Sequence, residues 1–316
     1  MLNRKLFRNI SAGTYRLALF VSLLFWVSAS GKAAAASEVI ALLEGRQWPY
    51  EMALAGVVET CGCTPEVYYL EEILPVSEFN RKLVSLQPRL LVAVGTKSLE
   101  YILSHDFALP VVYAMVLNPW AKVGPGSGVV KGVSMNIAPK IYWEAMAHIS
   151  PAIQRIGLVY NPAETEILKD YAEKLAVEHG QELIAVPAQT PKEALRAIKD
   201  MASRIDAFWM LPDQTLIRQE VIDTLVSYSF EHDFVLIGLS GKHVTAGALM
   251  AYSFNSEAIG KSAGKMVHAI LQRSAIGDDN SIWAPDTDLA LNLKTAHKIG
   301  VSLDPSFVKR AESLIE

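Results

Sequence analysis

Two segments of this chain end a strand-like run on Asn-Pro. Residues 111–120 read Val-Val-Tyr-Ala-Met-Val-Leu-Asn-Pro-Trp, and residues 156–162 read Ile-Gly-Leu-Val-Tyr-Asn-Pro. β-Branched and aromatic residues favour strands, whereas Asn and Pro favour turns. Each segment therefore predicts a buried strand that stops at a sharp corner. Pro after Asn also suits the first position of a following helix.

The sequence around both corners alternates between short β-rich runs and amphipathic stretches. In the first half we expect strands at 38–43, 66–70, 90–94 and 111–116, and helices at 50–59, 76–86 and 98–104. In the second half we expect strands at 155–160, 182–186, 206–211 and 234–238, and helices at 140–148, 164–179, 191–204 and 214–231. Repeated strand–helix units are typical of parallel sheets covered on both faces. A chain of 316 residues accommodates two such domains.

The first 36 residues have the pattern of a secretory signal peptide. Basic residues precede an apolar run at 17–29, and Ala34-Ala35-Ala36 supplies a small-residue cleavage site. The run is short for a membrane span, so we expect cleavage before Ser37 and a periplasmic product. An uncleaved anchor helix is the alternative. No Cys directly follows the apolar run, so a lipid anchor is not expected.

Charge argues against nucleic acid as a partner. The chain has 29 basic and 33 acidic residues, and five of the basic residues lie in the first 36, which contain no acid. The processed chain therefore has nine more acidic than basic residues. Such a surface disfavours nucleic acid and anionic membrane faces.

Motifs for catalysis or cofactor binding are missing from the sequence. The segment Gly238-Leu-Ser-Gly-Lys242 fits neither a nucleophile elbow nor a phosphate-binding loop, and the seven histidines are scattered. Cys61 and Cys63 are too few for a metal site. They either lie in a plain turn or form a bridge, which would close a small, strained ring. We expect no enzyme activity, no cofactor and no metal.

Polar and aromatic residues follow the predicted strands. Ligands of open parallel sheets bind at the carboxyl ends of the strands. Helix capping explains Thr96, Asn161 and Asp213 about as well as ligand binding does, but it does not explain Arg46 or Trp48. The candidate ligand-binding residues are Arg46, Trp48, Tyr50, Thr96, Ser98, Asn118, Asn161, Asp213, Thr215 and Ser240.

Three segments of the second half carry a family resemblance. RIGLVYNPAE at 155–164, AFWMLPDQT at 207–215 and LALNLKTAHKIGVSLDPSFVKRAESLIE at 289–316 resemble the TrpX-like family of ABC-transporter substrate-binding proteins. Val94-Gly95-Thr96 and Lys131-Gly-Val-Ser134 in the first half match more weakly. The resemblance spans residues 38–316. The chain departs from the family at Asn118, where the family usually has Asp, and at Gln214, where it usually has Asn.

The resemblance implies a type I periplasmic binding protein, in which two Rossmann-like lobes with parallel sheets are linked by a hinge. One lobe would comprise residues 37–134 plus about 254–283, and the other residues 135–253 plus about 284–316. A strand at 247–253 would precede a helix at 256–273 that packs on the first lobe. Both Asn-Pro corners would then turn the chain away from a shared cleft.

The resemblance also implies a function. The chain would be the extracytoplasmic solute-binding component of an ABC importer, closing on a small polar ligand such as an amino acid and delivering it to a permease in the inner membrane. An extracytoplasmic sensor module for a signalling partner is the alternative. A Rossmann-type enzyme is less favoured because no base–nucleophile pair is recognised.

Each candidate residue has an expected role in that cleft. Thr96 and Ser98 stand at a predicted helix start and would bind a ligand carboxylate, since helix starts favour anions. Asp213 would pair with a ligand amine. Trp48 and Tyr50 would stack on an apolar or ring-bearing part of the ligand. Arg46 would add a second carboxylate contact, whereas Asn118 removes one partner for a positive group.

Overall fold

The computed structural model describes residues 38–72, 76–105, 107–124, 130–150, 152–275 and 281–316. The chain divides into a first segment, Met1–Ala36, and a compact unit, Ser37–Glu316. The predicted signal peptide and its cleavage site lie outside the described residues.

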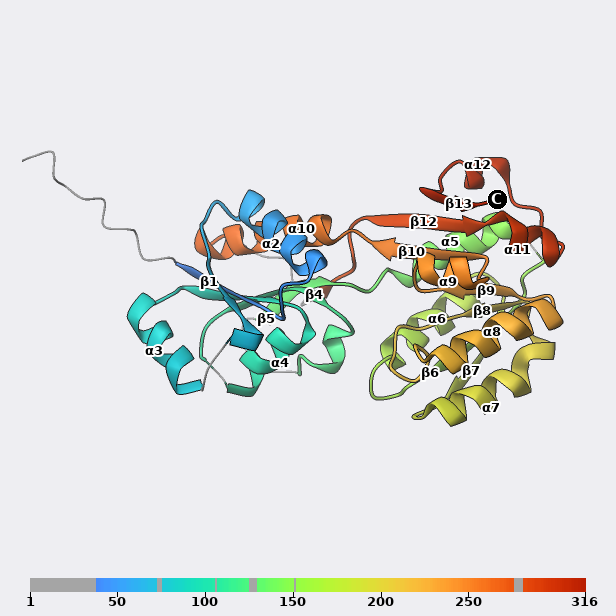
Figure 1. Ribbon diagram of the computed structural model, residues 1–316, viewed down its shortest axis with the longest axis horizontal. Helices are drawn as coiled ribbons and strands as arrows, with labels where there is room; N and C mark the ends of the chain where they lie inside the picture. The colour runs from blue at the N-terminus through green and yellow to red at the C-terminus, as the bar shows by residue number, and fades with distance from the viewer. Residues whose placement is uncertain (1–37, 73–75, 106, 125–129, 151, 276–280) are drawn as a thin grey trace, which may run out of the picture. The chain divides into compact units, whose positions relative to one another are not determined.

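Among the described residues, the first sheet has six strands, all paired in parallel, in the order β11-β5-β4-β3-β1-β2. Figure 1 shows this sheet with β1, β4 and β5 labelled. Its strands are β1 (Val39–Leu43), β2 (Glu66–Tyr69), β3 (Leu90–Val94), β4 (Val111–Val116), β5 (Val130–Ser134) and β11 (Ser281–Ile282). The elements between them are α2 (Trp48–Cys61), η1 (Leu70–Glu72), α3 (Val76–Leu86), α4 (Thr96–His105) and η2 (Pro119–Ala121).

The central strands of this sheet are buried on both faces, as a helix-covered parallel sheet requires, whereas β2 at its edge is partly exposed. β1, β3 and β4 are buried at every residue. Along β1, Val39, Ala41 and Leu43 join one core cluster, whereas Ile40 and Leu42 join a second cluster. This alternation follows from the two-residue period of a strand.

The second sheet has seven strands in the order β13-β12-β10-β9-β8-β6-β7. All its pairs are parallel except β10 with β12. Its strands are β6 (Arg155–Tyr160), β7 (Glu182–Pro187), β8 (Ala207–Trp209), β9 (Val235–Gly238), β10 (Met250–Phe254), β12 (Thr287–Asn292) and β13 (Ser313–Ile315). Its helices are α5 (Pro139–Ile149), α6 (Glu166–Glu178), α7 (Pro191–Met201), η3 (Ala202–Arg204), α8 (Gln219–Glu231), α9 (Gly241–Ala246), α11 (Leu293–Lys298) and α12 (Pro305–Val308). The predicted class, two α/β units with mostly parallel sheets, is confirmed.

The described strands imply that the chain passes between the two sheets three times: after β5, after β10 and after β11. The third passage contains Trp283, whose ring lies 5.3 Å from that of Trp120 and 5.5 Å from that of Tyr171, measured between centroids. Trp120 belongs to η2 beside the first sheet and Tyr171 to α6 beside the second. The lobe boundaries given above stay a prediction.

The helices predicted from residues 50 and 98 begin two residues earlier, at Trp48 and Thr96, and two other helices begin later than predicted. The helix predicted at 164–179 begins at Glu166, and the helix predicted at 214–231 begins at Gln219. Pro162 therefore does not occupy a first helical position. The carbonyl of Asn161 accepts the N–H groups of Glu164 and Thr165, which forms a turn before the helix.

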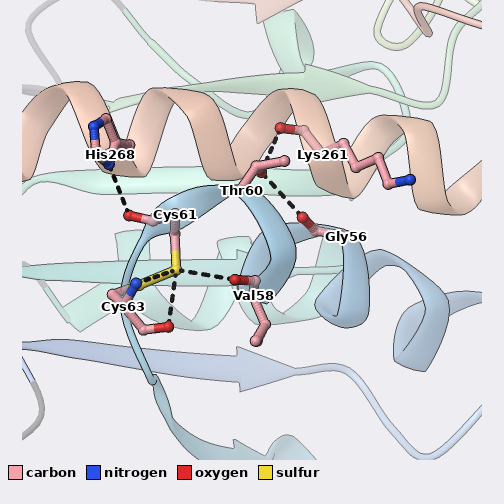
Figure 2. The surroundings of a disulfide bond; sticks show 7 residues. All are labelled: Gly56, Val58, Thr60, Cys61, Cys63, Lys261 and His268. Atoms are coloured by element: carbon pink, nitrogen blue, oxygen red, sulfur yellow. Dashed lines mark hydrogen bonds between the residues drawn. A yellow bond between two sulfur atoms is a disulfide. The ribbon is translucent and has the colours of Figure 1, made fainter.

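The helix α10 (Ser256–Leu271) packs against α2 at backbone distance. A Cβ added at Gly260 would lie 1.9 Å from the carbonyl oxygen of Ala53. The Thr60 hydroxyl donates to the carbonyl of Lys261 at 2.8 Å, and His268 Nδ1 donates to the carbonyl of Cys61 at 3.1 Å (Figure 2). The helix after β10 therefore packs on α2, beside the first sheet.

A disulfide joins Cys61 to Cys63 directly after α2 (Figure 2). The alternative of a plain turn is thereby excluded. Gly62 between the two cysteines has φ of 64°, a left-handed conformation that favours glycine. The bridge closes the turn at the end of α2, next to the contact with His268.

Asn118 anchors the first Asn-Pro corner through a buried side-chain network. Its backbone N–H donates to Asn136 Oδ1 at 2.8 Å, and Asn136 Nδ2 donates to Asn118 Oδ1 at 2.7 Å. The hydroxyl of Ser134 also donates to Asn136 Oδ1. Asn118 Nδ2 then donates to the carbonyl of Pro212 at 2.9 Å. The amide of Asn118, 4% exposed, thus uses both its acceptor and its donor.

We predict that Gly260→Ala destabilises the protein by about 1–3 kcal/mol, because the new methyl group forces α2 and α10 apart. Ala has a higher helix propensity than Gly, so a loss of stability in this variant is attributable to the steric clash. The midpoint of urea unfolding measures it. Gly241→Ala is the matched control, since a Cβ there meets nothing within 4 Å. Equal midpoints for Gly260→Ala and wild type would show that the helices are not in close contact.

We predict that Asn118→Asp lowers the free energy of unfolding by about 1–3 kcal/mol, because a carboxylate cannot donate to the Pro212 carbonyl. The loss should shrink at low pH, where the protonated carboxyl group regains a donor. Urea unfolding at pH 7 and pH 4 measures both effects. Asn80→Asp, at an exposed position of α3, controls for the added charge. A loss that is the same at both pH values argues against the hydrogen bond as its cause.

Candidate functional site

The segments that follow β4, β6 and β8 contact one another. Asn118, after β4, donates to the carbonyl of Pro212, after β8. Trp120 Nε1 donates to the carbonyl of Glu164, after β6, at 3.3 Å. These hydrogen bonds join the carboxyl-end segments of one sheet to those of the other.

Glu44, at the carboxyl end of β1, is a residue that the sequence analysis missed as a candidate. Its Oε2 accepts the backbone N–H of Lys97 at 3.1 Å, and its Oε1 lies 3.3 Å from Lys97 Nζ. The Glu44 side chain is 17% exposed. An acid directly after a buried strand was the available signal, but its partner lies 53 residues further along the chain.

Gly95 provides the space that Glu44 occupies. Its φ is 102°, and a Cβ added there would lie 2.6 Å from Glu44 Cβ and 2.8 Å from Glu44 Oε2. Tyr50 lies beside the same carboxylate. Burial raises the pKa of the Tyr50 phenol to about 12, and the neighbouring Glu44 carboxylate adds to the shift. Glu44 is therefore held between the turn at Gly95 and the ring of Tyr50.

Thr96 and Ser98 lie in the first turn of α4, as predicted, but they face different surroundings. Thr96 Oγ1 accepts the N–H of Leu117 at 3.2 Å and so joins the ends of β3 and β4. Ser98 is fully buried, and its hydroxyl has no hydrogen-bond partner in the described part of the chain. Whether either residue binds a carboxylate stays a prediction.

Arg46 is already paired. Its guanidinium lies 3.7 Å from the centroid of the Tyr69 ring and forms an ion pair with Glu72. Tyr69 in turn donates to Glu51 at 2.8 Å. Trp48, by contrast, is 71% exposed at the start of α2. A ligand at this edge would contact the exposed indole of Trp48 and the guanidinium of Arg46, whose charge is already paired with Glu72.

Asp213 accepts several hydrogen bonds, although it is only 1% exposed. Its Oδ2 accepts from the hydroxyl of Thr165 at 3.1 Å and from the N–H of Asn161 at 3.3 Å. Its Oδ1 accepts from both the N–H and the hydroxyl of Thr215, and from the N–H of Leu216. Asp213 thereby contacts two other predicted residues, Asn161 and Thr215, and fixes the turn after β8 against the turn after β6.

Ser240 precedes α9 and belongs to a local turn. The N–H of Leu239 donates to His243 Nδ1 at 3.1 Å, and Ser240 Oγ lies 3.4 Å from the same nitrogen. Burial lowers the pKa of His243, which favours the neutral ring that can accept this bond. Within the described chain, no hydrogen bond joins Ser240 to Asp213 or Thr96.

The described residues contain no group of three His, Cys, Asp or Glu side chains placed to hold a metal ion. Nor do they include a helix that is long and apolar enough to cross a membrane. A surface hollow of about 480 Å³ lies between α3 and the segment after α4, but none of the predicted site residues lines it.

Comparisons with known proteins agree with this fold. A tyrosine-binding protein of Clostridioides difficile (strain R20291) is 24% identical over 227 residues, which is 68% of this chain and 64% of that protein. The chain thus spans less than two thirds of this relative's length.

Two solved structures share the fold. A ligand-free, open substrate-binding protein with adhesive properties from Clostridium difficile has a TM-score of 0.67 at 17% identity. An ABC domain in complex with L-Trp from Streptococcus pneumonia has a TM-score of 0.60 at 18% identity. Each comparison covers 88% of this chain and 99% of the other.

The family of ABC transporter substrate binding proteins matches residues 73–315, well over half of the chain. The predicted family is confirmed, and its members are solute-binding proteins and not enzymes. This chain therefore belongs to the family of ABC transporter substrate-binding proteins.

Proposed function

We propose that this protein is the extracytoplasmic solute-binding component of an ABC importer and that it binds a small polar ligand of the amino-acid class between its two lobes. Family membership supports the transport role. The ligand class is supported by a relative named for tyrosine and by a structural neighbour that holds L-Trp.

The observation that carries the proposal is the meeting of strand ends from both sheets, through Asn118 with Pro212 and Trp120 with Glu164. Ligands of parallel sheets bind beyond the carboxyl ends of the strands. A site formed by two sheets is complete only when both lobes reach the ligand. Ligand binding would therefore stabilise a closed arrangement through hinge bending at the chain passages.

Each edge supplies different chemistry to this proposed site. On the first sheet, Trp48 and Tyr50 stack on a ring or apolar part of the ligand, and Thr96 contributes a hydroxyl group. Ser98 is fully buried and is not assigned a contact with the ligand. On the second sheet, Asp213 attracts an amine and also positions Asn161 and Thr215. Because the described donors already surround Asp213 at hydrogen-bond distance, we assign it the positioning role first.

The partner and location follow from the same proposal. A permease in the inner membrane recognises the closed form and accepts the ligand from it. Export through the predicted signal peptide, with cleavage before Ser37, delivers the protein to the periplasm.

Calorimetric titration of the protein with the twenty amino acids tests the proposal, and binding of at least one aromatic amino acid is expected. We predict that Trp48→Ala weakens that binding about fivefold to tenfold, because an aromatic pair contributes about 1 kcal/mol beyond buried area. The unfolding midpoint should not change, since Trp48 is largely exposed.

Val84→Ala is the control, since Val84 is also exposed but lies on α3. Failure of every amino acid to bind would reject the proposed ligand class. Unchanged affinity in Trp48→Ala would remove only Trp48 from the site.

A further inference from the structure

Glu44 occupies the position at the start of α4 that an anion would take. The first N–H groups of a helix lack intrahelical partners and carry partial positive charge, so they attract anions. In this protein the N–H of Lys97 already donates to Glu44 Oε2, at 3.1 Å. The carboxylate is supplied by the protein itself, from the end of the neighbouring strand β1.

The surroundings hold Glu44 in this place. Gly95 leaves room for its Cβ and Oε2, and the ring of Tyr50 lies beside the same glycine. Its ion pair with Lys97 involves an ammonium group whose side chain is 71% exposed, so water screens that attraction. A carboxylate has about four acceptor positions, and the N–H and ammonium of Lys97 use two of them. Acceptor positions therefore remain on Glu44 for a further donor.

The charged groups near both strand edges favour a cation. Arg46 is paired with Glu72, and the largely exposed Lys97 with Glu44, so each of these cations already has an anionic partner. Glu164 and Asp213 add negative charge on the second sheet's edge. A ligand carboxylate at the start of α4 would lie beside Glu44 and be repelled by it.

We propose that Glu44 sets the charge class of the ligand: the site binds the ligand's ammonium group and does not require its carboxylate. This inference rests on the proposed function, because it concerns the ligand of the same site. It reverses the role first expected for the start of α4, where Thr96 and Ser98 were assigned a ligand carboxylate. Amines that lack a carboxylate thereby enter the ligand class.

Calorimetry on the full chain with matched ligands tests the inference. The first series is L-tyrosine, tyramine, which lacks the carboxylate, and 3-(4-hydroxyphenyl)propanoate, which lacks the amine. L-tryptophan, tryptamine and indole-3-propanoate form the second. We expect the amine-only ligand to bind within tenfold of its amino acid, and the carboxylate-only ligand to bind at least a hundredfold more weakly.

Glu44→Gln separates charge from shape, because its amide oxygen can still accept the N–H of Lys97. We expect this variant to lose at least tenfold in affinity for the amine-only ligand and to gain affinity for the carboxylate-only ligand. Glu59→Gln is the matched control, since it removes one negative charge from the far end of α2. Unfolding midpoints of both variants should equal that of wild type.

The outcomes distinguish this inference from the proposed function. If the amino acids bind but the carboxylate-only ligands bind as well as the amine-only ones, the inference alone is overturned. The same holds if Glu44→Gln leaves the selectivity unchanged. If no member of either series binds, the proposed ligand class fails and the inference fails with it.

Discussion

The close approach of α2 and α10 is the constraint on which the arrangement of the chain depends. The two helices are about 200 residues apart in sequence, yet the backbone of Gly260 lies against the backbone of Ala53. To make this contact, the chain must return to the first sheet after completing β10 and then pass once more to reach β12. Each lobe is therefore assembled from separated segments, and several chain passages link the two sheets.

In both sheets a carboxylate links two neighbouring strand ends at the carboxyl edge. Glu44, after β1, accepts an N–H from the segment after the neighbouring strand β3. Asp213, after β8, accepts an N–H from the segment after the neighbouring strand β6. In each lobe a carboxylate therefore links the ends of two neighbouring strands. It pairs with a backbone N–H group, whose partial positive charge would otherwise lack a partner. Exposed side chains such as Trp48 therefore lie on strand-end segments whose positions these two carboxylates fix.

The buried parallel strands could be predicted because each leaves an uninterrupted apolar run, as Leu90–Val94 does. The strands β11, β12 and β13 near the end of the chain were not predicted. The helix starts after Asn161 and Asp213 could not be predicted either. Thr165, in the turn before α6, donates to Asp213, in the turn before α8, across 48 residues of sequence, and neither local pattern encodes this tertiary contact. Glu44 was missed for the same reason, because its partner N–H lies on another strand–helix connection. Asn118 was identified, but its amide binds Asn136 and Pro212, which no local pattern encodes.

The rings of Trp120, Trp283 and Tyr171 lie together at one passage between the sheets, with Trp283 in contact with both others. Trp120 follows the first sheet and Tyr171 the second, so relative rotation of the lobes must change the environment of these indoles. Their emission wavelength and its quenching by acrylamide provide a built-in optical readout of bending. Trp120 and Trp283 would therefore report the proposed bending without an attached dye, against the emission of the chain's other tryptophans.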